Sequence, residues 1–250
     1  MKAAAWTLAA ALVLLAAPLF AAKASKATSK GSPNAGTLVA GTAWTDTRYV
    51  RGLPGHAGRW GMPDLVAMVR QSAERVGRKH KGSILMIGDL SAKDGGPLHG
   101  HQSHQSGRDV DVGFYVTDAA GKPVRGGKFV RFGGDGRAKD GSELRFDDAR
   151  NWELVASMLV SSRATVRMIF VSGPLKIRLM KEAAARGASK ELSEKLMTTL
   201  MQPGNSTAHD DHFHVRVACA PRQKDVCYDD SRPGAPKKTH ASPTDDTSDD

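Results

Sequence analysis

Cysteine is scarce in this chain of 250 residues, which contains only two. Two thiols are too few for a zinc site built from thiolates. Cys219 and Cys227 lie close together near the C-terminus, and in an oxidising compartment they could close a small loop. Spacing alone does not show whether the geometry permits that bond, so the disulfide stays an open question at this point. Their late position also argues against a cysteine nucleophile.

Several catalytic and binding signatures are absent as well. The sequence has no G-x-S-x-G elbow, no Walker motif and no H-E-x-x-H helix. Its net charge of +10 is not concentrated in an arginine-rich run interleaved with aromatic residues, so nucleic acid is not expected as a partner. A basic surface suits a polyanionic partner, because long-range attraction raises the local concentration, and it also suits simple solubility.

The N-terminal segment has the anatomy of a secretory signal peptide. A positive start at Lys2 is followed by an apolar run over residues 3–20, and residues 22–24 offer an A-x-A cleavage site. The run is just long enough to span a bilayer, so an uncleaved anchor is the alternative. No cysteine near the junction could carry a lipid. We therefore expect a signal peptide over residues 1–24, and an exported protein without stable membrane insertion after cleavage.

Composition divides the remaining chain into three parts. Residues 25–41 are mostly Ala, Ser, Thr, Lys and Gly, which predicts a flexible linker. Residues 231–250 are rich in Pro, Lys, Thr, Ser and Asp without apolar periodicity, which predicts a disordered tail. Residues 42–230 remain as one folded domain that is long enough to bury a core.

Within that domain, strands and helices intermingle without a regular β-α-β spacing. Apolar and alternating runs predict strands over residues 83–90, 108–116, 165–172 and 212–218. Start signals and apolar periodicity predict helices from Pro63, after Asp147-Asp148, from Pro174 to Gly187, and over about residues 189–201. The expected fold is α+β, a single domain in which helices flank a small antiparallel sheet.

Histidine is concentrated in two short segments that lead into expected strands. Six of the nine histidines fall there, namely His99, His101, His104, His209, His212 and His214. Because side chains alternate along a strand, His212 and His214 would point to the same face. Asp111 could approach from a neighbouring strand, with His104 on the loop before it. These residues are therefore candidates for one shared site.

Imidazole and carboxylate groups that meet at one point favour zinc. Three nitrogen or oxygen ligands with a fourth position left for water form the pattern of catalytic zinc sites. Calcium and magnesium prefer sets made of oxygen alone. His-rich tracts can also bind metal loosely, but they usually lie in disordered polar sequence, whereas both segments here run directly into strands. We therefore expect Zn²⁺ as the cofactor, held rigidly on the sheet.

Five longer motifs occur in a fixed order along the chain. They are Ile87-Gly-Asp-Leu-Ser91, Gly95-Gly-Pro97, His101-x-x-His104-Gln-Ser-Gly-x-Asp-Val-Asp111, Phe146-Asp-Asp-Ala-Arg-Asn-Trp152 and His209-x-x-His212-x-His214-Val-Arg216. Together they resemble the penicillin-insensitive murein endopeptidases over about residues 49–217. His-x6-Asp followed by a later His-x-His is also similar to the wider lysostaphin, D-Ala-D-Ala carboxypeptidase and hedgehog-type metallopeptidase fold.

The resemblance assigns expected roles to seven residues. It implies zinc ligands at His104, Asp111 and His214, catalytic histidines at His212 and His209, and further site or substrate contacts at His101 and Asp147. Capping of the following helix is the competing role for the aspartates before it, Asp147 included. Arg108 departs from the family pattern, which usually has an apolar residue there; it faces away from Asp111, so packing is affected rather than chemistry.

The activity implied by the resemblance is hydrolysis of the D-alanyl to meso-diaminopimelyl cross-link of peptidoglycan in the periplasm, by a zinc metalloendopeptidase. Two alternatives remain. One is a D,D-carboxypeptidase or dipeptidase that trims uncross-linked stems. The other is a non-catalytic module that binds zinc or the cell wall, which would require a damaged ligand set, whereas every expected ligand is present. Oligomeric state is not predicted.

Overall fold

Two antiparallel strands with alternating side chains form the centre of the protein. The computed structural model describes residues 26–204 and 208–229, so the expected signal peptide and tail lie outside the described residues. Strands β7 (Asp109–Gly113) and β13 (His212–Val217) pair with His214 directly opposite Asp111. Because successive side chains point to opposite faces, the acidic and imidazole groups share one face and the valines and Phe213 share the other.

The main sheet is antiparallel at its centre and parallel at both edges. In spatial order it contains β12 (Leu200–Met201), β11 (Val166–Phe170), β13, β7, β6 (Leu85–Ile87) and β4 (Val50–Gly52). β12 runs parallel to β11, and β4 runs parallel to β6. The α+β prediction is confirmed, and the expected antiparallel sheet gains a parallel strand at each edge.

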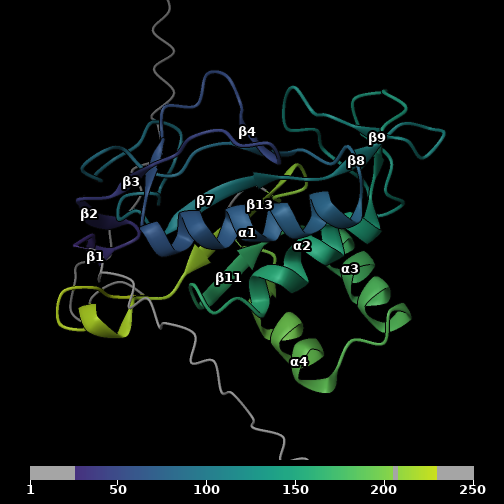
Figure 1. The fold of residues 1–250 in the computed structure, drawn as a ribbon. Coiled ribbons are helices and arrows are strands. Elements are labelled where there is room, and N and C mark those ends of the chain that lie inside the picture. The colour runs from purple at the N-terminus through teal and green to yellow at the C-terminus, as the bar shows by residue number, and fades with distance from the viewer. Residues whose placement is uncertain (1–25, 205–207, 230–250) are drawn as a thin grey trace, which may run out of the picture.

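Helices cover the apolar face of this sheet. The chain forms α1 (Pro63–Lys79), α2 (Asp148–Leu159), α3 (Gly173–Ala185) and α4 (Lys190–Thr199). Helix α1 begins at a proline, which suits the first turn because its missing N–H would have no helical partner. Helix α1 crosses in front of β7 and β13 (Figure 1), and the apolar side chains of α1 and α2 share one core with Val110, Val112 and Phe213. The opposite, polar face is therefore left for the histidines.

Smaller pairings surround the main sheet. They are β1 (Thr28–Ser32) with β2 (Ala35–Val39), β3 (Thr42–Ala43) with β5 (Trp60–Gly61), and the set β10 (Arg145–Phe146), β8 (Val116–Thr117) and β9 (Pro123–Val124). A short 3₁₀ helix, Pro221–Gln223, follows β13. In the part of the chain that the structure describes, no helix has both the length and the apolar character needed to cross a membrane.

The expected flexible linker over residues 25–41 is wrong for most of its length. β1 and β2 form an antiparallel hairpin, and Leu38 within it is 1% exposed. The hairpin is held at its far side by the C-terminal segment, where Gly31 donates its N–H to Val226 O at 2.7 Å. Small polar residues form strands when distant partners satisfy their backbone groups, and composition does not reveal such partners. The folded unit therefore includes residues 28–39, most of the segment expected to be a linker.

The C-terminal segment is fastened in two ways. Cys219 and Cys227 form a disulfide, which answers the question left open by their spacing. Arg108 lies buried beneath this segment and donates hydrogen bonds to Tyr228 O at 2.6 Å, Asp229 Oδ1 at 2.8 Å and Ser29 Oγ at 3.1 Å. An arginine at this position is thus accommodated by acceptors from both ends of the described chain.

Candidate metal centre

Three donor atoms converge on the polar face of the sheet. Nδ1 of His214 lies 3.1 Å from Oδ1 of Asp111, its partner across the β7–β13 ladder. Nε2 of His104 lies 3.3 Å from the same oxygen and 3.2 Å from Nδ1 of His214. All three side chains are buried. These are the three residues that the resemblance implied as zinc ligands.

His104 reaches this point from a strained backbone. Its φ of 66° lies in the left-handed region, which residues other than glycine rarely adopt. Oδ2 of Asp109 accepts its backbone N–H at 3.2 Å, and the carbonyl of Leu90 accepts a hydrogen bond from its Nδ1. Strain of this kind persists where the surroundings enforce it, and it concentrates at functional sites.

The N-terminal hairpin braces the loop that carries His104. Gln105 donates its N–H to Pro33 O at 3.0 Å, and Leu38 donates to Asp94 O at 2.9 Å. Leu38 also fills the space beside Gly107, where an added Cβ would meet the leucine side chain at 2.7 Å. The segment predicted as a linker is therefore a support for the site.

The hydrogen-bond partners of the two buried histidines fit a bound cation. Nδ1 of His104 donates to a backbone carbonyl, and Nε2 of His214 donates to Asp109 Oδ1 at 3.1 Å. Each ring then turns its remaining lone pair toward the other ring and toward Asp111, an arrangement that a shared cation stabilises. Metal-ligating histidines are typically held in this way. Tetrahedral zinc with ligands at 2.0–2.1 Å would separate neighbouring donor atoms by about 3.3 Å, close to the separations here.

Both buried aspartates are ionised at neutral pH. Burial alone would raise the pKa of Asp111, but His104 and His212, when they are protonated and no cation is bound, outweigh it and hold that pKa well below the usual range. Burial likewise opposes ionisation of Asp109, but His214 and Arg216 lower its pKa. A metal requires deprotonated ligands, so this environment prepares the site for one.

His212 stands beside the three donors. Its Nε2 is 3.4 Å from Oδ1 of Asp111, and its Nδ1 donates to Asp211 at 2.6 Å. Burial lowers the pKa of this imidazole, but the two carboxylates raise it more strongly, to about 10. The ring of Phe129 stacks on it with centroids 4.8 Å apart. Its position and its proton suit a role in proton transfer or charge stabilisation.

His209 lies in the same group of rings. Its centroid is 5.2 Å from that of His212 and 5.8 Å from that of His214, and its φ of 48° is again left-handed. The next residue, Asp210, is clamped by Arg131 at 2.9 Å and Lys139 at 2.8 Å. Asp210 and Asp211 therefore hold the segment that carries both histidines.

His101 forms a second, looser group with two of the candidate ligands. Donor atoms of His101, His104 and Asp111 lie within 4.8 Å of one another. We favour His214 as the third ligand, because its nitrogen is 3.1 Å from Asp111, whereas Nδ1 of His101 is 3.7 Å from that carboxylate.

Nε2 of His101 donates a hydrogen bond to Asp89, a residue to which the sequence assigned no role of its own. Burial opposes ionisation of Asp89, but hydrogen bonds from His101, Gly58 and His56 hold its pKa at about 2.

Asp147 is placed elsewhere. Its carboxylate caps α2 by accepting the N–H of Arg150 at 2.9 Å, and it pairs with the guanidinium of the same residue at 2.7 Å. Within the described ranges it contacts none of the site histidines. The capping role that the sequence offered as the alternative is the one observed.

The fold and the donor set together define an α+β protein with a candidate His/Asp metal site on the polar face of its sheet. Residues 31–242 match the sequence profile described as penicillin-insensitive murein endopeptidase. The chain belongs to the penicillin-insensitive murein endopeptidase family.

Relatives bearing that name come from several bacteria. The Haemophilus influenzae protein is 26% identical over 167 residues, covering 64% of this chain and 52% of the relative. The Pectobacterium atrosepticum protein is 29% identical over 178 residues, covering 70% and 57%. The Klebsiella pneumoniae protein is also 29% identical over 178 residues, covering 70% and 59%. The chain thus spans just over half the length of these relatives.

Proposed function

We propose that this protein is an exported zinc metalloendopeptidase that hydrolyses the D-alanyl to meso-diaminopimelyl cross-links of peptidoglycan in the periplasm. The observation that carries the proposal is the convergence of His104, Asp111 and His214 donor atoms within 3.3 Å of one another. Family membership supports the substrate class, since the relatives are named for action on murein.

The donor set supports zinc as the metal. Two imidazoles and one carboxylate suit it, and no thiolate is nearby. Bound there, zinc would supply a Lewis acid for the scissile carbonyl and lower the pKa of a water molecule. His104, Asp111 and His214 would hold it. His214 and His104 are oriented for this by Asp109 and the Leu90 carbonyl.

The remaining histidines would manage protons at the reacting amide. Asp211 accepts the Nδ1 hydrogen of His212, so Nε2 of His212 faces the ligand group and can donate a proton there. His209 lies beside His212, where it can assist the proton transfer or bind substrate. Phe129 against His212 and Phe170 against His214 give the site apolar walls that limit access of bulk water.

The proposal is tested by digesting purified cross-linked murein with the mature protein and reading the products by mass spectrometry. We expect cross-linked dimers to be converted to monomers, with activity lost on chelation and restored by zinc. His214→Ala should abolish turnover. His99→Ala removes an exposed histidine of the same loop outside the donor group and serves as the matched control.

Three outcomes would contradict the proposal. Dimers that survive while free pentapeptide stems lose their terminal residue would indicate a D,D-carboxypeptidase. Dimers that survive in protein shown to contain zinc and to sediment with murein would indicate a binding module. Cleavage that persists in the chelated protein would exclude the metal mechanism.

A further inference from the structure

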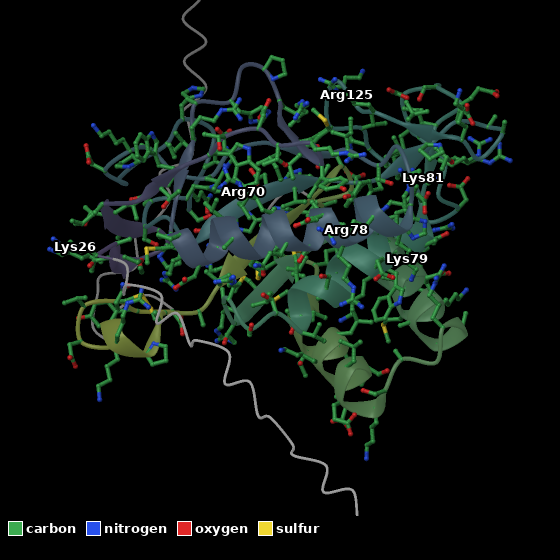
Figure 2. All side chains as sticks on the ribbon, viewed as in Figure 1. Lys26, Arg70, Arg78, Lys79, Lys81 and Arg125 are labelled. Atoms are coloured by element: carbon green, nitrogen blue, oxygen red, sulfur yellow. A yellow bond between two sulfur atoms is a disulfide. The ribbon has the colours of Figure 1, made fainter. Side chains whose placement is uncertain are left out.

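The outer face of α1 carries a dense group of cations. From Arg70 to Lys81 the chain has five basic residues and one acidic residue, a net charge of +4 in a protein whose total is +10. Figure 2 shows Arg70, Arg78 and Lys79 along this helix, with Lys81 just beyond its end. The side chains of Arg78 and Lys79 are 72% and 51% exposed. We call Arg70, Arg75, Arg78, Lys79 and Lys81 the α1 basic face.

These cations are positioned by their contacts and are only partly neutralised, since Arg78 pairs with Glu74 at 2.6 Å and two carboxylates in all face the five cations. Arg70 donates to Thr45 O at 2.9 Å and lies over the ring of Trp44 at 5.2 Å, so no carboxylate is involved. Arg75 and Lys79 share one carboxylate, that of Glu153 on α2. Preorganised side chains lose less conformational entropy when they bind a partner. The face is therefore both charged and partly ordered before binding.

The α1 basic face and the candidate metal centre lie on opposite sides of the sheet. The apolar side of α1 packs with Val110 and Val112 of β7, whereas Asp109 and Asp111 of the same strand point to the histidines. A partner bound along the outer side of α1 would leave the site accessible. The face is thus suited to anchoring rather than to presenting the bond to be cut.

We propose that the α1 basic face docks the enzyme onto an insoluble polymer that carries carboxylates at intervals, as peptidoglycan does. The choice of peptidoglycan as the polymer rests on the function proposed above. The cations from Arg70 to Lys79 are spread along about 14 Å of helix and do not converge on a point, which matches repeated anionic groups better than a single small anion. Attraction of this kind raises the local enzyme concentration and weakens as salt screens it.

The test compares two triple variants with equal loss of charge. Arg78→Gln, Lys79→Gln and Lys81→Gln remove exposed cations from the face, and Lys181→Gln, Lys190→Gln and Lys224→Gln remove exposed lysines elsewhere. Sedimentation with purified murein is measured in the presence of chelator, which prevents turnover, at 50 and 300 mM salt. Cleavage of a soluble cross-linked dimer is measured in parallel.

We expect the α1 triple variant to bind murein at least fivefold more weakly than the parent at 50 mM salt, and the control less than twofold. The difference should vanish at 300 mM salt, and both variants should cleave the soluble dimer at the parental rate. Equal binding of the two triple variants would overturn the proposal. Sedimentation with vesicles containing phosphatidylglycerol distinguishes a membrane surface from murein. If the α1 triple variant lost binding to these vesicles but bound murein as the parent does, the face would be assigned to a membrane surface and the proposal would be overturned. Failure of the parent to cleave the soluble dimer would contradict the proposed function alone, because binding is scored separately.

Discussion

Asp109 lies behind the candidate ligands and is fully buried. Its Oδ1 accepts hydrogen bonds from Arg216 Nε at 2.6 Å and from His214 Nε2 at 3.1 Å, while its Oδ2 accepts the backbone N–H of His104. One carboxylate therefore sets the ring orientation of one ligand and the backbone position of another. Partners of this kind are as important to a metal site as the ligands themselves.

Replacement of this carboxylate by Asp109→Asn should lower zinc affinity about 10- to 100-fold, because a neutral amide cannot hold both ligands in place. Competition with a chromophoric chelator measures the change, and circular dichroism checks that the variant is folded. Asp135→Asn, at an exposed aspartate, is the matched control. Unchanged affinity in folded Asp109→Asn would contradict a positioning role.

The sequence signals for site residues differ in strength. His104, Asp111, His212 and His214 were predicted as a group, and the structure brings them together, because a short spacing within a strand fixes the face on which a side chain lies. Asp109 was within reach of the same reasoning, since it precedes Asp111 by two residues. Asp89 was not, because its contact with His56 joins positions 33 residues apart through loops that have no periodic pattern.

At the scale of elements, the helices and strands were predicted correctly where burial of one face spaces the apolar residues regularly along the sequence. Helices α1 and α2 and strands β7 and β13 carry regular apolar positions, and each lies within a few residues of its expected range. The β1–β2 hairpin has no such period. Its register depends on backbone hydrogen bonds to segments that follow it by about 60 to nearly 200 residues. The local sequence does not reveal hydrogen-bond partners that lie so far away along the chain.

Helices α1 and α2 are joined by ion pairs that should titrate. Lys79 and Arg75 lower the pKa of Glu153, against the opposing effect of its burial. A carboxyl group with a lower pKa in the folded state stabilises the fold above its unfolded pKa, and this contribution is lost as pH falls through the folded pKa. Glu153→Gln should therefore cost about 1 kcal/mol of unfolding free energy at pH 7, with a smaller difference from the parent below about pH 4.

Urea unfolding at pH 7, 5 and 3.5 would measure this difference. Glu74→Gln is the control, since Glu74 makes a more exposed pair with Arg78 within α1 and should cost only about 0.3–0.5 kcal/mol. A Glu153→Gln penalty that stays constant over the whole pH range would show that the pair does not stabilise the protein through its charge.

At the scale of the whole molecule, the two ends of the described chain are bound to each other. Tyr228 donates its N–H to Gly31 O at 3.0 Å, and the buried guanidinium of Arg108 links Ser29 to Asp229. The Cys219–Cys227 disulfide closes the loop that makes these contacts. Both ends thus stabilise the domain that supports the site.

Loss of the disulfide in a Cys219→Ser, Cys227→Ser double variant should lower the unfolding free energy by about 2–3 kcal/mol, because a short closed loop restricts the unfolded chain. For a domain of this size the corresponding fall in Tm is about 5–10 °C. Thermal unfolding with and without reductant measures it, and the double variant should no longer respond to reductant. A parental protein whose Tm is insensitive to complete reduction would contradict the expectation.

The contacts between the two ends of the described chain affect the order in which parts of the protein can fold. A chain synthesised from its N-terminus presents the β1–β2 hairpin early, yet the acceptor for the Gly31 N–H is the carbonyl of Val226. The brace behind the His104 loop is therefore incomplete until almost the whole domain has emerged, and β13 brings His214 only shortly before. If the protein is exported as proposed, the candidate metal centre would be complete only when nearly the whole chain has crossed the membrane, and the proposed hydrolysis would be confined to the compartment in which folding ends.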